Sequence, residues 1–226
     1  VGSSSAFTIA LNHALLASLK QSPTAYELAN RAFNIERYKL KEVVGIQDQI
    51  AIAFGGFNDV KINKNGEYDI QKVLISRSDQ NYLMNRFLLV YTGISRLASS
   101  IAEKKVKELV KKEKVMKEMS SLVNLASDCI KHSRFDEFGK LLHENWQLKK
   151  SISSVITNDK IDELYDIGIK NGALGGKLLG AGSGGFMLFF CKEGFKEKIS
   201  EKLNDKIIVP FDVSESGSKV IYEETK

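Results

Sequence analysis

The sequence predicts an α+β protein of two domains. Its 226 residues are enough to bury about 70% of the surface that the unfolded chain exposes. Apolar residues at helical spacing dominate residues 95–151, whereas residues 172–179 and 185–191 are short apolar runs that meet at a glycine-rich turn. The order strand, helices, two strands, helix, strand predicts an antiparallel sheet covered by helices on one side. We place the domains over residues 1–80 and 81–226.

The first domain begins with a predicted helix over residues 6–19. Apolar residues cover much of its surface, which is typical of a helix buried inside a fold. Thr24 and Glu27 then form a capping-box pattern, which predicts a second helix ending near Tyr38. The remaining predicted elements are a short helix at residues 47–53, and strands at 60–62 and 68–75 around a turn at Asn65-Gly66.

The second domain begins with a predicted strand at residues 87–91. The helical segment 95–151 has polar joints near Ser120 and residues 132–134, which divide it into several packed helices. The elements predicted after it are a helix at 161–169, the two strands already named, a helix at 195–203 and a strand at 206–213.

The net charge of +5 comes mainly from lysine, and seven lysines fall within residues 104–117. Such a segment is one signature of binding to nucleic acid or an anionic membrane. Glutamates alternate with these lysines along an apolar stripe, however, so an exposed helix with one buried face is favoured. The segment also lacks the aromatic residues that stack on bases. We therefore expect neither nucleic acid nor membrane as a partner, and no apolar run approaches the roughly 18 residues of a membrane span.

The two cysteines, Cys129 and Cys191, lack metal-ligand spacing and lie in apolar segments. They indicate reduced, buried thiols in a cytoplasmic protein. The chain opens at Val1 without methionine or the features of a secretory signal, so we expect it to begin inside a longer sequence.

Three hydroxyl residues follow a glycine directly before the first helix: Gly2, Ser3, Ser4 and Ser5. The start of a helix binds phosphate well, because backbone N–H groups and the helix dipole both face the anion. A serine-rich N-cap is the structural alternative, since serine is among the best caps. The segment does not fit the G-x-x-x-x-G-K-[ST] pattern of a P-loop.

A second glycine cluster occupies residues 175–185, with glycine at six of the eleven positions. A hairpin turn needs only one or two glycines, and each further glycine costs roughly 0.5–1 kcal/mol of conformational entropy. We interpret the excess as a close approach of the backbone to a ligand.

Two carboxylates between the glycine clusters are candidates for chemistry. Glu36 lies near the end of the second predicted helix, and Asp48 begins the short helix after it. Their structural alternatives are a solvated residue beside Arg37 and an N-cap, respectively. The spacing alone does not bring them together.

Residues 2–6, 45–58 and 176–185, in this order, resemble the phosphate-binding loop, the catalytic-aspartate segment and the C-terminal glycine motif of GHMP kinases. The family loop has one further glycine, so the chain begins after it, with Val1 in a leucine position. Residues 91–99 and 143–150, and the run Gly172-Ala173-Leu174-Gly175-Gly176-Lys177, resemble the branch that phosphorylates D-glycero-D-manno-heptose 7-phosphate. The resemblance implies a partial ribosomal protein S5 domain 2-like N-terminal domain and a ferredoxin-like C-terminal domain.

The resemblance also implies roles for individual residues. Gly2, Ser3, Ser4 and Ser5 would wrap the phosphates of ATP, Ser4 would share Mg²⁺ with Glu36, and Asp48 would accept the proton of the sugar hydroxyl or orient it. The substrate would be closed in by Gly182, Ser183, Gly184 and Gly185. The product would be a sugar bisphosphate with its new phosphate on the anomeric oxygen. Family members carry a further N-terminal segment, so we expect poor turnover from this chain alone.

Several alternatives stay open. The acceptor could be another sugar of the fucose or galactose type, because the phosphate machinery does not identify the hydroxyl group. A non-catalytic nucleotide-binding homologue is a second alternative, which the retention of Ser4, Glu36 and Asp48 disfavours. Trp146 could stack on the sugar, and Lys149 or Arg96 could hold its phosphate, but a core tryptophan and surface cations fit equally well. The sequence does not decide the oligomeric state, and a homodimer is one option.

Overall fold

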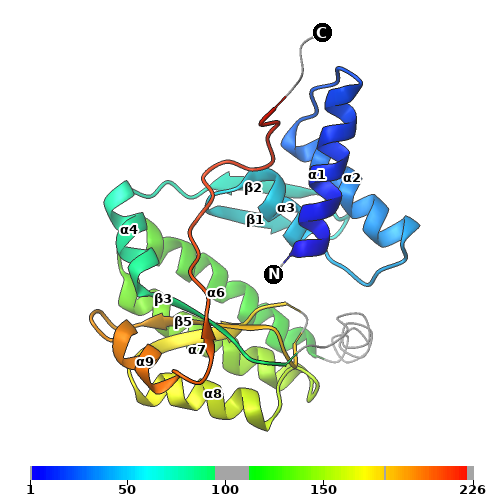
Figure 1. The fold of residues 1–226 in the computed structure, drawn as a ribbon. Coiled ribbons are helices and arrows are strands. Elements are labelled where there is room, and N and C mark those ends of the chain that lie inside the picture. Colours follow the sequence, from blue (N-terminus) through cyan, green and yellow to red (C-terminus); the bar gives the residue numbers. More distant parts are fainter. Residues whose placement is uncertain (1, 95–111, 181, 223–226) are drawn as a thin grey trace. The chain divides into compact units, whose positions relative to one another are not determined.

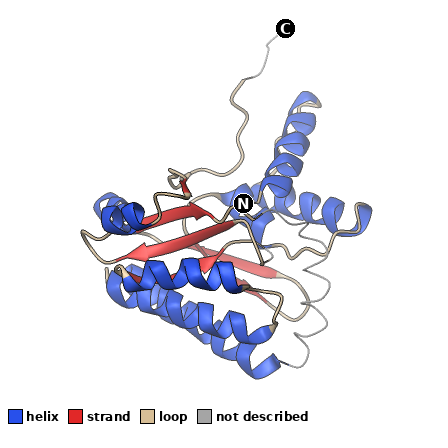
Figure 2. Ribbon diagram, turned by 60° about the horizontal axis from the view of Figure 1, so that its bottom comes forward, coloured by secondary structure: helices blue, strands red, loops and turns tan. Residues whose placement is uncertain are grey.

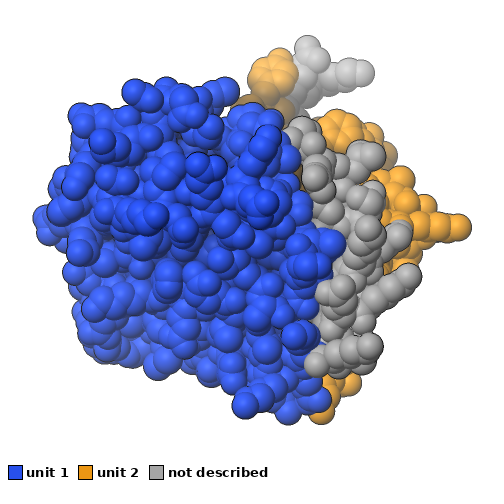
Figure 3. Space-filling view, turned by 90° about the horizontal axis from the view of Figure 1, so that it is seen from below, with its two compact units in different colours: residues 1, 73–212 blue, residues 2–72, 213–226 orange. Residues whose placement is uncertain are grey.

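The computed structural model describes residues 2–94, 112–180 and 182–222. The chain forms two compact units: residues 73–212, here the larger unit, and residues 2–72 with 213–226, here the smaller unit. Figure 3 distinguishes them by colour. The predicted domains over 1–80 and 81–226 differ from these units, because the C-terminal residues belong with the beginning of the chain. The extents of the functional domains stay a prediction.

The smaller unit packs its helices beside a two-stranded antiparallel sheet (Figure 1). Its elements are α1 (Ser3–Ser18), α2 (Ala25–Asn34), the π-helix η1 (Ile35–Lys39), α3 (Gln47–Phe54), β1 (Asn58–Ile62) and β2 (Tyr68–Lys72). The predicted second helix continues through η1, and Asn65-Gly66 lies in the turn between the strands. Small residues of α2 and α3 let the helices approach closely, and the buried core consists of Ile9, Leu16, Leu28, Ala29, Ala32, Ile50 and Ala53.

Helix α1 is apolar on both faces, but only one face is buried. Ser5, Thr8 and Ile9 face inward, as expected for residues three and four positions apart. The opposite face carries an exposed apolar stripe at intervals of four residues, with exposed fractions of 69% at Phe7 and 56% at Leu15. The prediction of a helix buried all round is therefore wrong for the outer face, because α2, η1 and α3 contact α1 on one face only.

The capping box at the start of α2 is confirmed. The amide of Glu27 donates to Oγ1 of Thr24 over 3.2 Å, and the amide of Thr24 donates to Oε2 of Glu27 over 2.7 Å. The hydrogen bonds from Thr24, first the one from its backbone, hold the pKa of Glu27 below its usual range. Local side-chain chemistry thus sets where α2 begins.

The C-terminal segment returns to the smaller unit, which the sequence does not predict. The amide of Gly56 donates to the carbonyl of Ser214 over 2.7 Å, and a Cβ atom on Gly217 would lie 1.8 Å from the carbonyl oxygen of Ala53. Nδ1 of His13 lies 2.8 Å from Oγ of Ser218. The segment is therefore packed against the end of α3 and the side of α1.

The larger unit is built on a four-stranded antiparallel sheet with strand order β4-β5-β3-β6 (Figure 2). Its strands are β3 (Phe87–Tyr91), β4 (Ala173–Leu178), β5 (Phe186–Cys191) and β6 (Ile207–Ile208). Its described helices are α4 (Arg77–Arg86), α6 (Glu113–Lys131), α7 (Phe135–Ile152), α8 (Asp159–Lys170) and α9 (Lys196–Lys202). The α+β class is confirmed.

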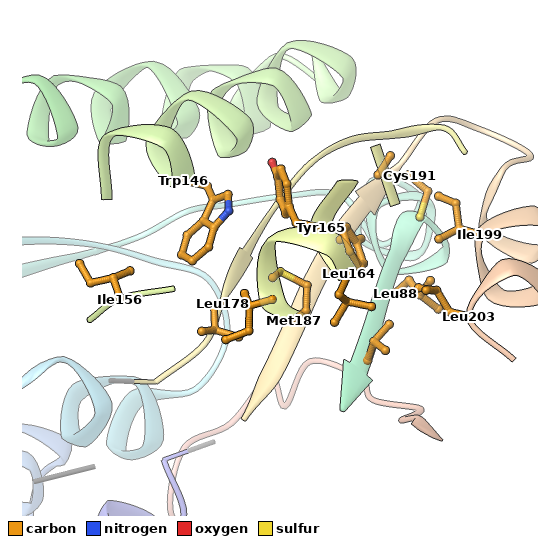
Figure 4. Packing of buried hydrophobic residues seen from close by; sticks show 14 of the residues in the cluster. Leu88, Trp146, Ile156, Leu164, Tyr165, Leu178, Met187, Cys191, Ile199 and Leu203 are labelled. Atoms are coloured by element: carbon orange, nitrogen blue, oxygen red, sulfur yellow. The ribbon is translucent and has the colours of Figure 1, made fainter. Parts of the chain in front are cut away.

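Helices cover both faces of this sheet, and not one face as predicted. Met187 and Phe189 of β5 belong to the main core cluster with residues of α8 and α9 (Figure 4). Phe190, which points to the other face because side chains alternate along a strand, packs with Leu83 of α4 and Phe135 of α7. The short apolar run of β5 carries large side chains for both faces, as is typical of a fully buried strand.

Three further predictions need correction. Helix α4 was not predicted, since its only buried side chains are Leu83 and Arg86. Helix α6 runs through Ser120 without a joint. The strand predicted over 206–213 is two residues long, because the chain leaves the sheet before Pro210, which has no N–H to donate.

The lysine-rich segment is described only from Lys112 onward, and residues 95–111 lie outside the described part of the chain. Within α6, Lys117 pairs with Glu113 over 2.7 Å on an exposed face. Both cysteines are buried and free, and burial raises the pKa of the Cys191 thiol to about 12. Among the described residues, no helix combines the length and the apolar character needed to cross a membrane.

Candidate functional site

The centre of the candidate site is a buried carboxylate in the smaller unit. Glu36 has an exposed fraction of 0%. Two donors converge on its Oε2 atom: Oγ of Ser5 at 3.0 Å and Nε2 of Gln49 at 2.7 Å. Its other oxygen, Oε1, is buried and has no hydrogen-bond partner among the described residues. A buried carboxylate oxygen without a partner is costly, so it is a good place to expect a ligand.

Three elements bring these side chains together. Glu36 follows Leu28 and Ala32 at intervals of four residues, which puts it on the buried face of α2 as it passes into η1. π-Helical turns are rare in proteins, and those that occur are often found at functional sites. Ser5 lies in the first turn of α1 on its inner face, and Gln49 lies in the first turn of α3.

A second carboxylate lies at the start of α1. Gly2 is the N-cap of α1 and has a positive φ of 66°, which favours glycine. A Cβ atom built on Gly2 would lie 3.9 Å from Cγ and Oδ2 of Asp48. The N-cap of α3 is Ile46, so the N-cap alternative for Asp48 is wrong. The structure thus places Asp48 beside the first turn of α1.

The serines of the first turn differ in their surroundings. Ser3 and Ser4 are exposed, whereas Ser5 is buried with an exposed fraction of 4%. It is Ser5 that donates to Glu36, and no direct hydrogen bond between Ser4 and Glu36 occurs among the described residues. The N-cap, Gly2, has no side chain to satisfy the first N–H groups of the helix, so the serine N-cap alternative is wrong too.

The glycine cluster of the larger unit is explained mostly by packing within the protein. A Cβ atom built on Gly175 would lie 2.1 Å from the carbonyl oxygen of Gly139. A Cβ atom built on Gly184 would lie 2.6 Å from the carbonyl oxygen of Ile94. Only at Gly180 is the surrounding space open to 4 Å among the described neighbours, and Ala181 lies outside the described residues. The excess of glycine is therefore not by itself a sign of a ligand.

The four predicted substrate residues lie in this loop. Ser183 is buried and its Oγ donates to the carbonyl of Val155. The amide of Gly185 donates to the carbonyl of Ile94 over 2.9 Å. The loop is therefore held by hydrogen bonds to its own unit, and the role of Gly182, Ser183, Gly184 and Gly185 in binding substrate stays a prediction.

Three residues were candidates for contact with the sugar or its phosphate, and the structure excludes one of them. Trp146 has an exposed fraction of 0% and lies in the main core cluster, so it cannot stack on a sugar (Figure 4). Nζ of Lys149 donates to the carbonyl of Leu178 over 3.3 Å. Arg96 lies outside the described residues.

The donor set suits a hard cation that is shared with phosphate. No group of three or more His, Cys, Asp or Glu side chains that could hold a metal alone occurs among the described residues. Mg²⁺ is usually bound by one or two carboxylates together with water and substrate phosphates. Oε1 of Glu36 fits that requirement.

Sequence reasoning missed Ser5 as the partner of Glu36 and missed Gln49 entirely. A usable signal exists for Glu36, because a carboxylate four residues after Ala32 interrupts an apolar face. Ser5 likewise shares a face with Ile9. No local pattern could indicate Gln49, because its contact with Glu36 spans 13 positions and joins two helical segments, η1 and α3.

A family model described as "GHMP kinases N terminal domain" matches residues 1–56, and one described as "GHMP kinases C terminal" matches residues 125–208. The chain belongs to the GHMP kinase family. This GHMP kinase chain is 32% identical to a D-glycero-alpha-D-manno-heptose 7-phosphate kinase of Campylobacter jejuni, over 97% of its own length and 66% of that protein. It is 28% identical to a bifunctional fucokinase/GDP-fucose pyrophosphorylase of Arabidopsis thaliana, over 68% of the chain and 15% of that protein.

Superposition on a solved kinase structure confirms the predicted fold. The mevalonate kinase of Methanococcus jannaschii superposes with a TM-score of 0.70 and 26% identity, covering 92% of this chain and 62% of that one. The chain thus spans about two thirds of the length of the relatives that it matches along most of its own length.

Proposed function

We propose that this chain is the larger part of an ATP-dependent sugar kinase that transfers the γ-phosphate to the anomeric hydroxyl of D-glycero-D-manno-heptose 7-phosphate. One observation carries the kinase proposal: Glu36 and Asp48 both lie at the first turn of α1, although both come much later in the sequence than that turn. Phosphoryl transfer depends mainly on positioning and charge neutralisation, and these groups supply both. The heptose assignment is supported by the relative in Campylobacter jejuni.

Each group has a part in this proposal. The backbone N–H groups of Gly2, Ser3, Ser4 and Ser5 bind the phosphates of ATP, as the start of a helix does. Ser4 and Glu36 would hold Mg²⁺, which would neutralise negative charge on the phosphates of ATP. Asp48 accepts the proton of the sugar hydroxyl or orients that hydroxyl. The loop with Gly182, Ser183, Gly184 and Gly185 binds the sugar phosphate, and the product is the 1,7-bisphosphate.

The reaction is proposed for the cytoplasm, where two buried, unpaired cysteines stay reduced. ATP and the sugar phosphate are the partners that the proposal requires. A homodimer remains one option for the assembly.

Replacement of Asp48 by alanine in the full gene product tests the chemistry. We expect turnover to fall by orders of magnitude while the affinity for nucleotide stays nearly unchanged, because the carboxylate acts mainly in the transition state. Steady-state kinetics with a coupled ADP assay and nucleotide titration measure the two effects. Asp69→Ala, at an exposed site on β2, is the matched control. Equal turnover of Asp48→Ala and the unsubstituted protein would remove Asp48 from the mechanism.

The similarity to a fucokinase supports a second candidate, a kinase for an unphosphorylated hexose. A panel of heptose 7-phosphate, fucose, galactose and mevalonate, compared by kcat/KM, separates the candidates. Preference for fucose or galactose over the heptose phosphate would overturn the heptose assignment and keep the kinase. Binding of ATP without consumption on any acceptor would favour a non-catalytic homologue.

A further inference from the structure

We infer that Gln49 is a positioning residue that fixes the Glu36 carboxylate so that Oε1 is presented to the Mg²⁺ of MgATP. This inference rests on the proposed function and adds to it a residue that neither the motifs nor the comparisons assign. Gln49 is 1% exposed, and its Nε2 atom lies 2.7 Å from Oε2 of Glu36.

The geometry of the pair leaves one carboxylate oxygen available. The last torsion of a glutamate is broad, so an unrestrained carboxylate can turn either oxygen toward a ligand. Here the hydroxyl of Ser5 and the amide of Gln49 both donate to Oε2. A carboxylate oxygen has about two lone-pair positions, so these two donors occupy Oε2 and leave Oε1 for a cation.

The orientation of the Gln49 amide follows from the charge of its partner. A reversed amide would place its oxygen against a carboxylate oxygen, and two acceptors repel. The NH₂ group therefore faces Glu36, and the amide oxygen faces elsewhere. That oxygen is also buried and has no partner among the described residues.

A purely structural role does not explain this pair. Leaving a buried acceptor without a partner is costly, and two such oxygens occur here on adjacent side chains. An apolar side chain of the same size would fill the position of Gln49 without that cost. Groups that hold metal ligands by hydrogen bonds typically change metal affinity by about 10- to 100-fold when they are replaced.

The test compares two glutamines of the same helix in the full gene product. Gln49→Met keeps the size of the side chain and removes its donor, and Gln47→Met makes the same change at an exposed position. Affinity for Mn²⁺ is measured by water-proton relaxation in the presence of the β,γ-imido analogue of ATP. We expect Gln49→Met to weaken Mn²⁺ binding about tenfold and Gln47→Met to leave it unchanged. Denaturant unfolding of the same samples reports whether each variant is folded.

Two further variants separate positioning from other effects. Gln49→Leu also removes the donor without adding charge, so it should weaken Mn²⁺ binding as well and provides the result if Gln49→Met does not fold. In a Glu36→Gln background, Gln49→Met should cause no further loss, because Gln49 acts through Glu36. Unchanged Mn²⁺ affinity in both Gln49 variants, or full additivity with Glu36→Gln, would overturn the inference and leave the proposed function standing. Unchanged affinity in Glu36→Gln alone would remove the magnesium site of the proposed function itself.

Discussion

Each compact unit buries one charged side chain among its described residues, and the two side chains differ in how fully their polar atoms are hydrogen-bonded. In the larger unit, Arg86 is 4% exposed and is surrounded by partners. Its Nε donates to the carbonyl of Cys191 over 2.8 Å, and its Nη2 pairs with Asp136. The guanidinium also lies 4.6 Å from the ring centroid of Phe190. In the smaller unit, Glu36 keeps one buried oxygen without a described partner.

The difference separates a structural charge from a functional one. A buried charge whose hydrogen bonds are satisfied ties elements together, and here Arg86 joins the end of α4 to β5 and α7. A buried charge with an unused oxygen costs stability in the absence of its ligand. We therefore expect replacement of Arg86 to affect folding and replacement of Glu36 to affect ligand binding.

The largest expected effect on stability is that of Arg86→Ala. The variant loses a charge-assisted hydrogen bond and the contact with aromatic rings, so the free energy of unfolding should fall by roughly 2–4 kcal/mol. Urea unfolding followed by tryptophan fluorescence measures this in the larger unit, because the single tryptophan of the sequence, Trp146, lies in its core. Arg134→Ala, at a half-exposed ion pair, is the control and should cost less than about 1 kcal/mol. An equal loss of unfolding free energy in the two variants would contradict a structural role for the buried charge of Arg86.

Glu36→Gln should reduce activity without reducing stability, which is the opposite of the effect expected for Arg86→Ala. A neutral amide of the same shape is less costly to bury than a carboxylate, so the free energy of unfolding without ligand should stay the same or rise by about 1 kcal/mol. Kinase activity should nevertheless be lost. Urea unfolding followed by circular dichroism measures stability, because the signal reports on the helices of both units. The ADP assay measures activity. A clear loss of stability would show that Glu36 has a structural role.

Asp136→Asn should have the smallest effect. This partner of Arg86 has an exposed side chain, with 68% of it accessible. The amide oxygen of asparagine still accepts from Nη2 of Arg86, and the Asp136 end of the pair is open to solvent, so the free energy of unfolding should change by less than about 1 kcal/mol. The same tryptophan-fluorescence measurement applies. A loss as large as that of Arg86→Ala would mean that the ion pair, and not burial beside β5 and the rings, holds Arg86.

Several elements were predictable because their causes are local. Thr24 and Glu27 start α2 through a hydrogen-bond pattern that four residues contain. Strand β3 occupies the predicted residues, since an apolar run bounded by polar residues is typical of a buried strand. The opening serines and the two carboxylates were also recognised as candidates from residue type and order.

Predictions failed where the cause lies elsewhere in the chain. Glycine at position 175 is required by the backbone of α7, and glycine at 217 by the end of α3. The burial of helix α1 was overestimated because apolar composition does not say which face has a neighbour. The return of the C-terminal segment to the smaller unit has no local signal at all.

The sequence by itself determined the α+β class and the cap that starts α2, and it named candidate groups for binding phosphate and metal, because propensity, periodicity and residue chemistry are properties of short segments. Only the tertiary structure decided that Ser5 and Gln49 hold Glu36 and that Asp48 lies beside Gly2. The reason is physical: hydrogen bonds and close packing depend on distances between atoms, and the distances between α1, η1 and α3 are set by how their apolar faces pack together.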